Sequence, residues 1–171
     1  MTVYLGLGSN LGDRIGYIRR AIEQLEARGV AITRAASIYE TEPVDSPPEA
    51  PQFLNTTVEA QTSATPDALL GICLEIERQE GRVRPAPNAP RTLDIDILLF
   101  GNEIHESAGL VVPHPRYTER RFVLVPLNEI APDVVDPARK QTVAELLALC
   151  SDETEVRLYG PPPALPAGRR W

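Results

Sequence analysis

The chain has 171 residues, enough for one domain with a sizeable core, and its 43% hydrophobic and 24% charged residues are ordinary for a globular protein. The net charge of -7, from 17 basic and 24 acidic residues, argues against a surface built for nucleic acid or an anionic membrane. No stretch approaches the roughly 20 apolar residues that a membrane span needs, so we expect a cytoplasmic protein.

The first predicted elements are a strand and a helix. Residues 2–8 alternate as a buried strand does and end in a Gly-Ser-Asn break. The glycines around this break do not complete a dinucleotide-binding fingerprint, because position 11 is leucine. Asp13 is suited to cap a helix whose apolar residues recur at helical spacing and which ends at Gly29.

The middle of the chain continues the alternation of strands and helices. Residues 30–39 and 53–60 read as strands, and a proline-rich loop of residues 40–51 separates them. A helix is predicted over residues 65–81, and residues 93–100 form a further strand. The order is that of an α+β, ferredoxin-like (split βαβ) fold with an antiparallel sheet and the helices packed on one face.

The stretch richest in chemical groups joins an arginine-bearing loop to an acid-bearing strand. Arg82, Arg84 and Arg91 precede Asp94 and Asp96, and the period of two puts both carboxylates on one strand face. Oxygen ligands suit Mg²⁺, and guanidinium groups pair with phosphate oxygens. An ordinary edge strand with solvated acids is the alternative; the nearby arginines favour metal and phosphate binding.

The C-terminal part adds smaller elements around this core. Residues 103–105 are predicted to pair with Leu110–Val112 as a hairpin, and Thr142 with Glu145 forms a capping box that opens a helix. We expect one domain over residues 1–160, with these added C-terminal helices supporting the sheet, followed by a proline-rich tail over residues 161–171.

Two motifs resemble the signatures of the 6-hydroxymethyl-7,8-dihydropterin pyrophosphokinase family. The first is Gly81-Arg-Val-Arg84 followed by Pro90-Arg-Thr-Leu-Asp-Ile-Asp96; the second is the Pro-His pair ending at His114, followed by Arg120 and Phe122, from which a helix to Ile130 is expected. The resemblance covers roughly residues 2–132. It implies transfer of diphosphate from ATP to the hydroxymethyl group of 6-hydroxymethyl-7,8-dihydropterin, giving AMP and the pterin diphosphate for folate biosynthesis.

The same resemblance implies the roles of individual residues. Asp94 and Asp96 would hold two Mg²⁺ ions, with Arg82 and Arg91 joining them in catalysis. The implied ATP contacts are Leu70, Glu77, Arg82, Arg84, Arg91, Ile97, His114 and Arg120. The implied pterin contacts are Gly8, Thr41, Glu42, Pro43, Val44, Phe53, Asn55 and Phe122, with the two rings stacking on the pterin and the asparagine amide pairing with its polar edge. A monomer that binds only these small molecules is expected.

The sequence departs from the family pattern in its arginine-bearing loop. Between Arg84 and Arg91 the loop is one residue shorter than in the best-known members, and Pro85 with Asn88 or Ala89 stands where a lysine and a tryptophan are expected. Position 53 is Phe rather than Tyr, which keeps the ring and drops a hydroxyl. We expect the loop to close over the substrates but to shield them less completely.

Three alternatives belong to other functional classes. A non-catalytic ferredoxin-like module that binds a nucleotide or another small ligand would need no metal. A phosphotransferase for another alcohol would share the two aspartates and the arginines but would not need the aromatic residues and the asparagine together. Nucleic-acid binding through the sheet suits the rings but not the acids or the net charge.

Overall fold

The computed structural model describes residues 1–43, 51–81 and 92–166 of the chain. The elements follow in the order β1 (Thr2–Ser9), α1 (Arg14–Ala27), β2 (Ala31–Ala35), β3 (Ile38–Thr41), β4 (Phe53–Gln61), α2 (Pro66–Gln79), β5 (Asp94–Phe100), β6 (His105–Ser107), β7 (Leu110–Val112), a 3₁₀ turn (Tyr117–Glu119), α3 (Arg121–Ile130), α4 (Val143–Leu149) and β8 (Val156–Gly160).

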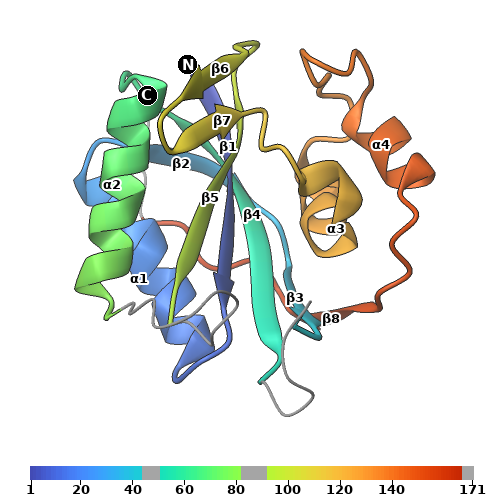
Figure 1. Ribbon diagram of the computed structural model, residues 1–171. Helices are drawn as coiled ribbons and strands as arrows, with labels where there is room; N and C mark the ends of the chain where they lie inside the picture. Colours follow the sequence, from blue (N-terminus) through green and yellow to red (C-terminus); the bar gives the residue numbers. More distant parts are fainter. Residues whose placement is uncertain (44–50, 82–91, 167–171) are drawn as a thin grey trace.

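The main sheet is antiparallel and has the predicted split βαβ arrangement (Figure 1). Its strand order is β5-β1-β4-β3-β8, and β2 also pairs with β4. The prediction of one strand over residues 30–39 is wrong, because this part of the chain forms two strands, β2 and β3, which pair with successive parts of β4. Between them Ala36 bonds to β4 through both its backbone N–H and its carbonyl, so the chain changes course without leaving the sheet.

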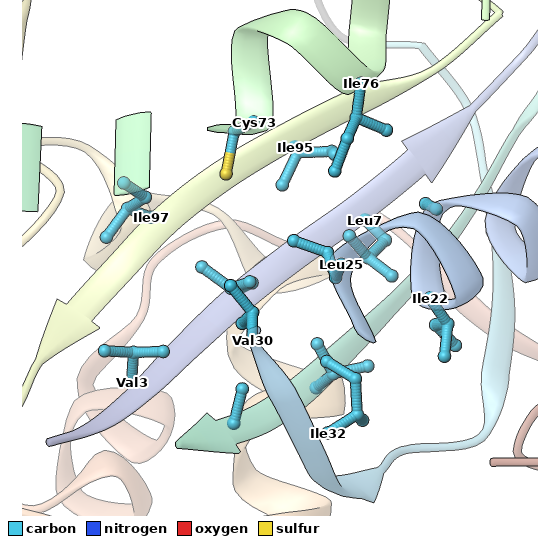
Figure 2. Close-up of a cluster of buried hydrophobic side chains, with 14 of the residues drawn as sticks. Val3, Leu7, Ile22, Leu25, Val30, Ile32, Cys73, Ile76, Ile95 and Ile97 are labelled. Carbon is cyan, nitrogen blue, oxygen red and sulfur yellow. The ribbon is translucent and has the colours of Figure 1, made fainter. Parts of the chain in front are cut away.

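The two faces of the sheet carry different hydrophobic clusters. Helices α1 and α2 cover one face as predicted, and Figure 2 shows Val3, Leu7, Ile95 and Ile97 among the side chains that fill this interface. The added helices α3 and α4 form the second cluster, which includes Tyr4 and reaches part of the opposite face. Asp94 and Asp96, which alternate with the core residues Ile95 and Ile97, therefore lie on the face that α1 and α2 leave open.

A β-bulge in β5 separates two parts of that strand. Leu5 pairs with Ile97, but the next pair is Tyr4 with Leu99, so Leu98 has no partner in β1. Leu98 and Leu99 consequently both pack in the cluster under α3. Before the bulge, residues 94–97 pair one by one with β1, so the bulge does not change the direction in which the two acids point.

The small hairpin differs from its prediction by two residues. The strand that pairs with Leu110–Val112 is His105–Ser107, not residues 103–105. Gly109 has φ +91°, which permits a tight turn directly between Ser107 and Leu110 and so fixes the register.

The helices agree with their prediction in one further detail. The capping box at Thr142 is confirmed, since both of its reciprocal bonds with Glu145 are present. None of the helices in the described ranges is long and apolar enough to cross a membrane.

Candidate active site

The two aspartates of β5 lie next to two glycines of β1. Gly8 pairs with Asp94 and Gly6 with Asp96, and both acids are half-buried. The apolar residues that alternate with them, Leu93, Ile95 and Ile97, belong to the core under α1 and α2, so the predicted alternation is confirmed. Because the paired glycines carry no side chains, the face around the carboxylates stays open for a ligand.

A first cavity of about 130 Å³ opens over these glycines and aspartates. Its lining includes the predicted pterin residues Gly8, Thr41, Glu42, Phe53, Asn55 and Phe122, together with Gly6, Leu98, Asp94, Asp96, Arg116 and Arg120. Pro43 is not part of the lining, and Val44 lies outside the described residues. The structure thus gathers residues from four strands and from α3 around one cavity that has aromatic, amide and carboxylate groups.

The amide of Asn55 is held in a defined orientation at the bottom of this cavity. The side chain is only 8% exposed, and its Nδ2 donates to the Thr41 hydroxyl at 2.8 Å. A Cβ placed on Gly8 would lie 2.9 Å from Asn55 Oδ1, so the absence of a side chain there makes room for the amide oxygen. A buried amide fixed in this way offers both a donor and an acceptor to a flat polar ligand.

Gly8→Ala is expected to raise the KM for the ligand of this cavity roughly tenfold while leaving the fold intact. The added methyl group would push the Asn55 amide out of position, and a misdirected hydrogen bond costs on the order of 1 kcal/mol or more. Steady-state kinetics and a circular-dichroism melt would measure the two effects. Gly71→Ala in α2 is the matched control, because a Cβ there meets no atom within 4 Å.

A second cavity of about 350 Å³ also borders Asp96. It brings together three predicted ATP contacts, Leu70, Ile97 and His114. Four hairpin residues, to which sequence reasoning gave no role, also contribute to its wall: Ser107, Gly109, Leu110 and Val111. Asp96 lines both cavities, so one carboxylate stands where two ligands would meet.

The remaining predicted ATP contacts among the described residues do not line the second cavity. Arg120 lines the first cavity rather than the second. Glu77 is buried and lines neither; its Oε2 accepts a hydrogen bond from the Ile95 N–H at 2.8 Å, which ties β5 to α2. The arginines Arg82, Arg84 and Arg91, and the loop expected to close, lie outside the described residues.

Sequence reasoning missed Arg116, which lines the first cavity. The signal was available, because Arg116 stands two positions after His114 inside the same motif. Within residues 1–43, 51–81 and 92–166, no group of three or more His, Cys, Asp or Glu residues gathers as a metal site would. The metal prediction therefore rests on the carboxylate pair of β5.

His114 is placed as a neutral hydrogen-bond donor. Its backbone N–H bonds to the Leu98 carbonyl, and its Nδ1 accepts a 3.2 Å hydrogen bond from the Arg116 N–H. With Nδ1 used as an acceptor, the proton of the neutral ring is on Nε2. Burial, and then the positive charge of Arg120, lowers the pKa of His114 from 6.5 to about 4. The ring consequently stays uncharged near pH 7.

We expect the imidazole of His114 to titrate with a pKa of about 4 in the free protein. Because the folded pKa lies below the unfolded one, the stability contribution is complete above about pH 6.5 and is lost as the pH falls toward 4. Two-dimensional NMR of the ring carbons and nitrogens would follow the titration, and His105→Gln, which removes the second histidine, would assign the signals. Titration of His114 above pH 6 would contradict the burial argument.

Comparison with known proteins adds independent findings. The family model described as 7,8-dihydro-6-hydroxymethylpterin-pyrophosphokinase (HPPK) matches residues 4–132. A 2-amino-4-hydroxy-6-hydroxymethyldihydropteridine pyrophosphokinase of Bacillus subtilis is 45% identical over 157 residues, covering 91% of this chain and 89% of the relative. A protein of the same name from Aquifex aeolicus is 41% identical over 144 residues, covering 84% of this chain and 89% of the relative.

Two further matches are to longer proteins. The folic acid synthesis protein fol1 of Pneumocystis carinii is 40% identical over 142 residues, which are 83% of this chain but 19% of that protein. The crystal structure of wild-type Plasmodium falciparum HPPK-DHPS superposes with a TM-score of 0.63 at 16% identity, covering 86% of this chain and 44% of that one. At this identity the superposition shows the fold alone.

Proposed function

The chain belongs to the 7,8-dihydro-6-hydroxymethylpterin-pyrophosphokinase family and is an ATP-dependent transferase of folate synthesis, and we propose that its reaction takes place where the two cavities meet at Asp96. The observation that carries this proposal is the shared carboxylate. On one side of it lie rings and an amide suited to a pterin, and on the other side lies a cavity with a neutral histidine. Two substrates bound in these cavities would meet beside Asp96.

We assign the first cavity to 6-hydroxymethyl-7,8-dihydropterin. Phe53 and Phe122 both line it, and aromatic rings stack on a flat heterocycle whatever its polar pattern. Asn55 then selects among heterocycles, because its fixed amide matches an edge that presents both a donor and an acceptor. Bound in this way, the hydroxymethyl group would be directed toward the aspartates of β5.

We assign the second cavity and its rim to ATP. His114 presents an Nε2–H donor without carrying a charge of its own, and Arg116 and Arg120 add positive charge from the adjoining cavity. The hydroxymethyl oxygen would attack the β-phosphorus and give its proton to an aspartate of β5. The bond between the β-phosphorus and the oxygen that bridges to the α-phosphorus would break, and AMP would leave with that oxygen. The cations and the histidine would hold the phosphates in line and stabilise the charge that develops on them.

Mg²⁺ fits the residues present in the site. Asp94 and Asp96 supply two carboxylates on one face of a rigid strand, and the facing Gly6 and Gly8 leave space beside them. Mg²⁺ uses few protein ligands and takes the remainder of its shell from water and phosphates. We propose that these aspartates hold two ions, which when bound would offset charge on the attacking and leaving oxygens.

Measurement of AMP release tests the function directly. The protein is incubated with ATP and Mg²⁺, with and without 6-hydroxymethyl-7,8-dihydropterin, and pterin-dependent AMP is the expected product. Omission of Mg²⁺ should abolish the release. ADP instead of AMP would mean transfer of a single phosphoryl group, and absence of any nucleotide product would favour a non-catalytic binding module.

We also propose that the protein is a cytoplasmic monomer. The described residues that we assign to the two substrates all belong to one chain. We further propose that the domain spans residues 1–160, since β8, the last strand among the described residues, ends at Gly160. Pro163 is also buried, so the first residues of the proline-rich segment pack against this domain. Light scattering coupled to gel filtration would test the monomer, and a mass of about 38 kDa, twice the 18.8 kDa of the chain, would overturn it.

A further inference from the structure

The segment that follows the family-matched residues contacts the loop carrying His114 at both of its ends. We call residues 113–122 the His114 loop and residues 133–154 the C-terminal clamp. The family model ends at residue 132, so the clamp lies beyond it. Among the described residues, its side-chain hydrogen bonds to the loop come from Asp136, Arg139 and Asp152.

Asp136 is the buried centre of the first contact. The side chain is 0% exposed, and its Oδ2 accepts hydrogen bonds from the Tyr117 hydroxyl at 2.6 Å and from Arg139 Nη1 at 2.9 Å. Its Oδ1 accepts from the backbone N–H groups of Ala138 and Arg139. Burial alone would raise the pKa of Asp136, but these hydrogen bonds hold it below its usual range. A buried carboxylate satisfied in this way fixes the groups around it.

Arg139 connects that centre to the part of the loop beside the second cavity. Its Nη2 donates to the Pro115 carbonyl at 3.4 Å, and its guanidinium lies over the Tyr117 ring, 5.5 Å from the ring centroid. Pro115 directly follows His114, and both residues line the second cavity. The position of the histidine ring is therefore tied to a charge held by the clamp.

Asp152 makes the second contact, at the start of α3. The helix has no side-chain cap from its own N-cap residue, Arg120. Instead, Asp152 Oδ2 accepts from the Arg121 N–H at 2.9 Å, while its Oδ1 accepts from the Thr154 N–H at 2.9 Å. This distant cap fixes the helix end that carries Arg120 and Phe122, both of which line the first cavity.

We propose that Asp136, Arg139 and Asp152 are positioning residues for the transfer reaction. They line neither cavity; they hold the His114 loop so that its histidine and arginine reach the phosphates and its phenylalanine reaches the pterin. This inference rests on the proposed assignment of the two cavities. It gives the segment beyond the family-matched residues a role in substrate binding as well as in folding.

Arg139→Met tests the first contact. Loss of the link to Pro115 should raise the KM for ATP about fivefold, as one misplaced hydrogen bond would, with the KM for the pterin unchanged. The imidazole ¹⁵N shifts of His114 should move away from a single Nε2–H tautomer, a change that lower stability alone would not produce. Arg139→Lys keeps a donor for Asp136, so its KM for ATP and its His114 spectrum should lie between those of Arg139→Met and the wild type.

Lys140→Met is the matched control. It removes a positive charge from the same turn and replaces it with a side chain of similar length, at a residue with φ 59° that is equally strained for both. Its KM values and its His114 spectrum should match those of the wild type. A folded Arg139→Met protein with an unchanged KM for ATP and an unchanged His114 spectrum would overturn the inference.

Asp152→Ala tests the second contact. It should raise the KM for both substrates, because the helix end that loses its cap carries Arg120, assigned to ATP, and Phe122, assigned to the pterin. Unchanged KM values in a folded variant would overturn this half of the inference. If Asp152→Ala fails to fold, Asp152→Asn replaces it; this variant has one acceptor oxygen in place of two and no charge, so it should raise both KM values by a smaller factor, and unchanged values would again overturn this half. Failure of the wild type to release AMP in a pterin-dependent manner would instead refute the proposed function, and the His114 spectrum would still test the clamp.

Discussion

Asp96→Asn is expected to lower kcat by roughly a thousandfold with the fold intact, because it removes one of the two carboxylates on which several kcal/mol of charge stabilisation would depend. The substitution keeps the shape of the side chain, and Asp96 lines both cavities, so each substrate would lose the same charged neighbour. Single-turnover measurement of AMP formation at saturating substrates and Mg²⁺ would separate this loss from weaker binding.

Asp133→Asn is the control for Asp96→Asn. It makes the same chemical change on an exposed residue outside both cavities, so its kcat should stay within about twofold of the wild type, as expected for surface substitutions. Thermal melts of both variants would establish that they are folded. Substantial turnover by a folded Asp96→Asn protein would remove this residue from the metal site.

Phe122→Leu is expected to raise the KM for the pterin by about ten- to a hundredfold, since stacking of a base on an aromatic ring contributes on the order of 1–3 kcal/mol. Leucine keeps much of the apolar contact that Phe122 makes with the cluster around α3, so the effect should come from the lost ring. Fluorescence titration with the pterin would measure the change in affinity without catalysis.

Phe122→Tyr keeps the ring and serves as the comparison, with an affinity close to that of the wild type. The KM for ATP should change little in either variant, because Phe122 does not line the second cavity. Equal pterin affinity in the leucine and tyrosine variants would show that the residue acts as a core side chain rather than as part of the binding site.

A structural feature could be predicted from the sequence where residues close together in the chain determine it. The alternation of Asp94 and Asp96 with buried residues is a property of one strand, and it appears in the structure as expected. β8 was missed because its five residues include the exposed Leu158 and show no clear alternation; it is a strand because β3 offers an edge for pairing. The shifted hairpin likewise follows the turn at Gly109 rather than the apolar pattern.

The site was predictable to a similar extent. The motif and the family resemblance led to Phe53, Asn55 and Phe122, which do line one cavity. The anchoring of the His114 loop could not be read in the same way, because Asp136 meets a hydroxyl 19 positions away and Asp152 meets an amide 31 positions away. Pairings of that length depend on how the elements pack, which no local pattern encodes.

The bulge at Leu98 also affects how this sequence can change in length during evolution. It separates the strand into an acid-bearing half and a half that packs under α3, so a residue gained or lost beyond Leu99 leaves the carboxylates where they are. A one-residue deletion between Gly6 and the bulge, or between Asp96 and the bulge, would instead turn a catalytic face toward the apolar core. Burial of a carboxylate among apolar side chains is so costly that such deletions should be absent from active relatives.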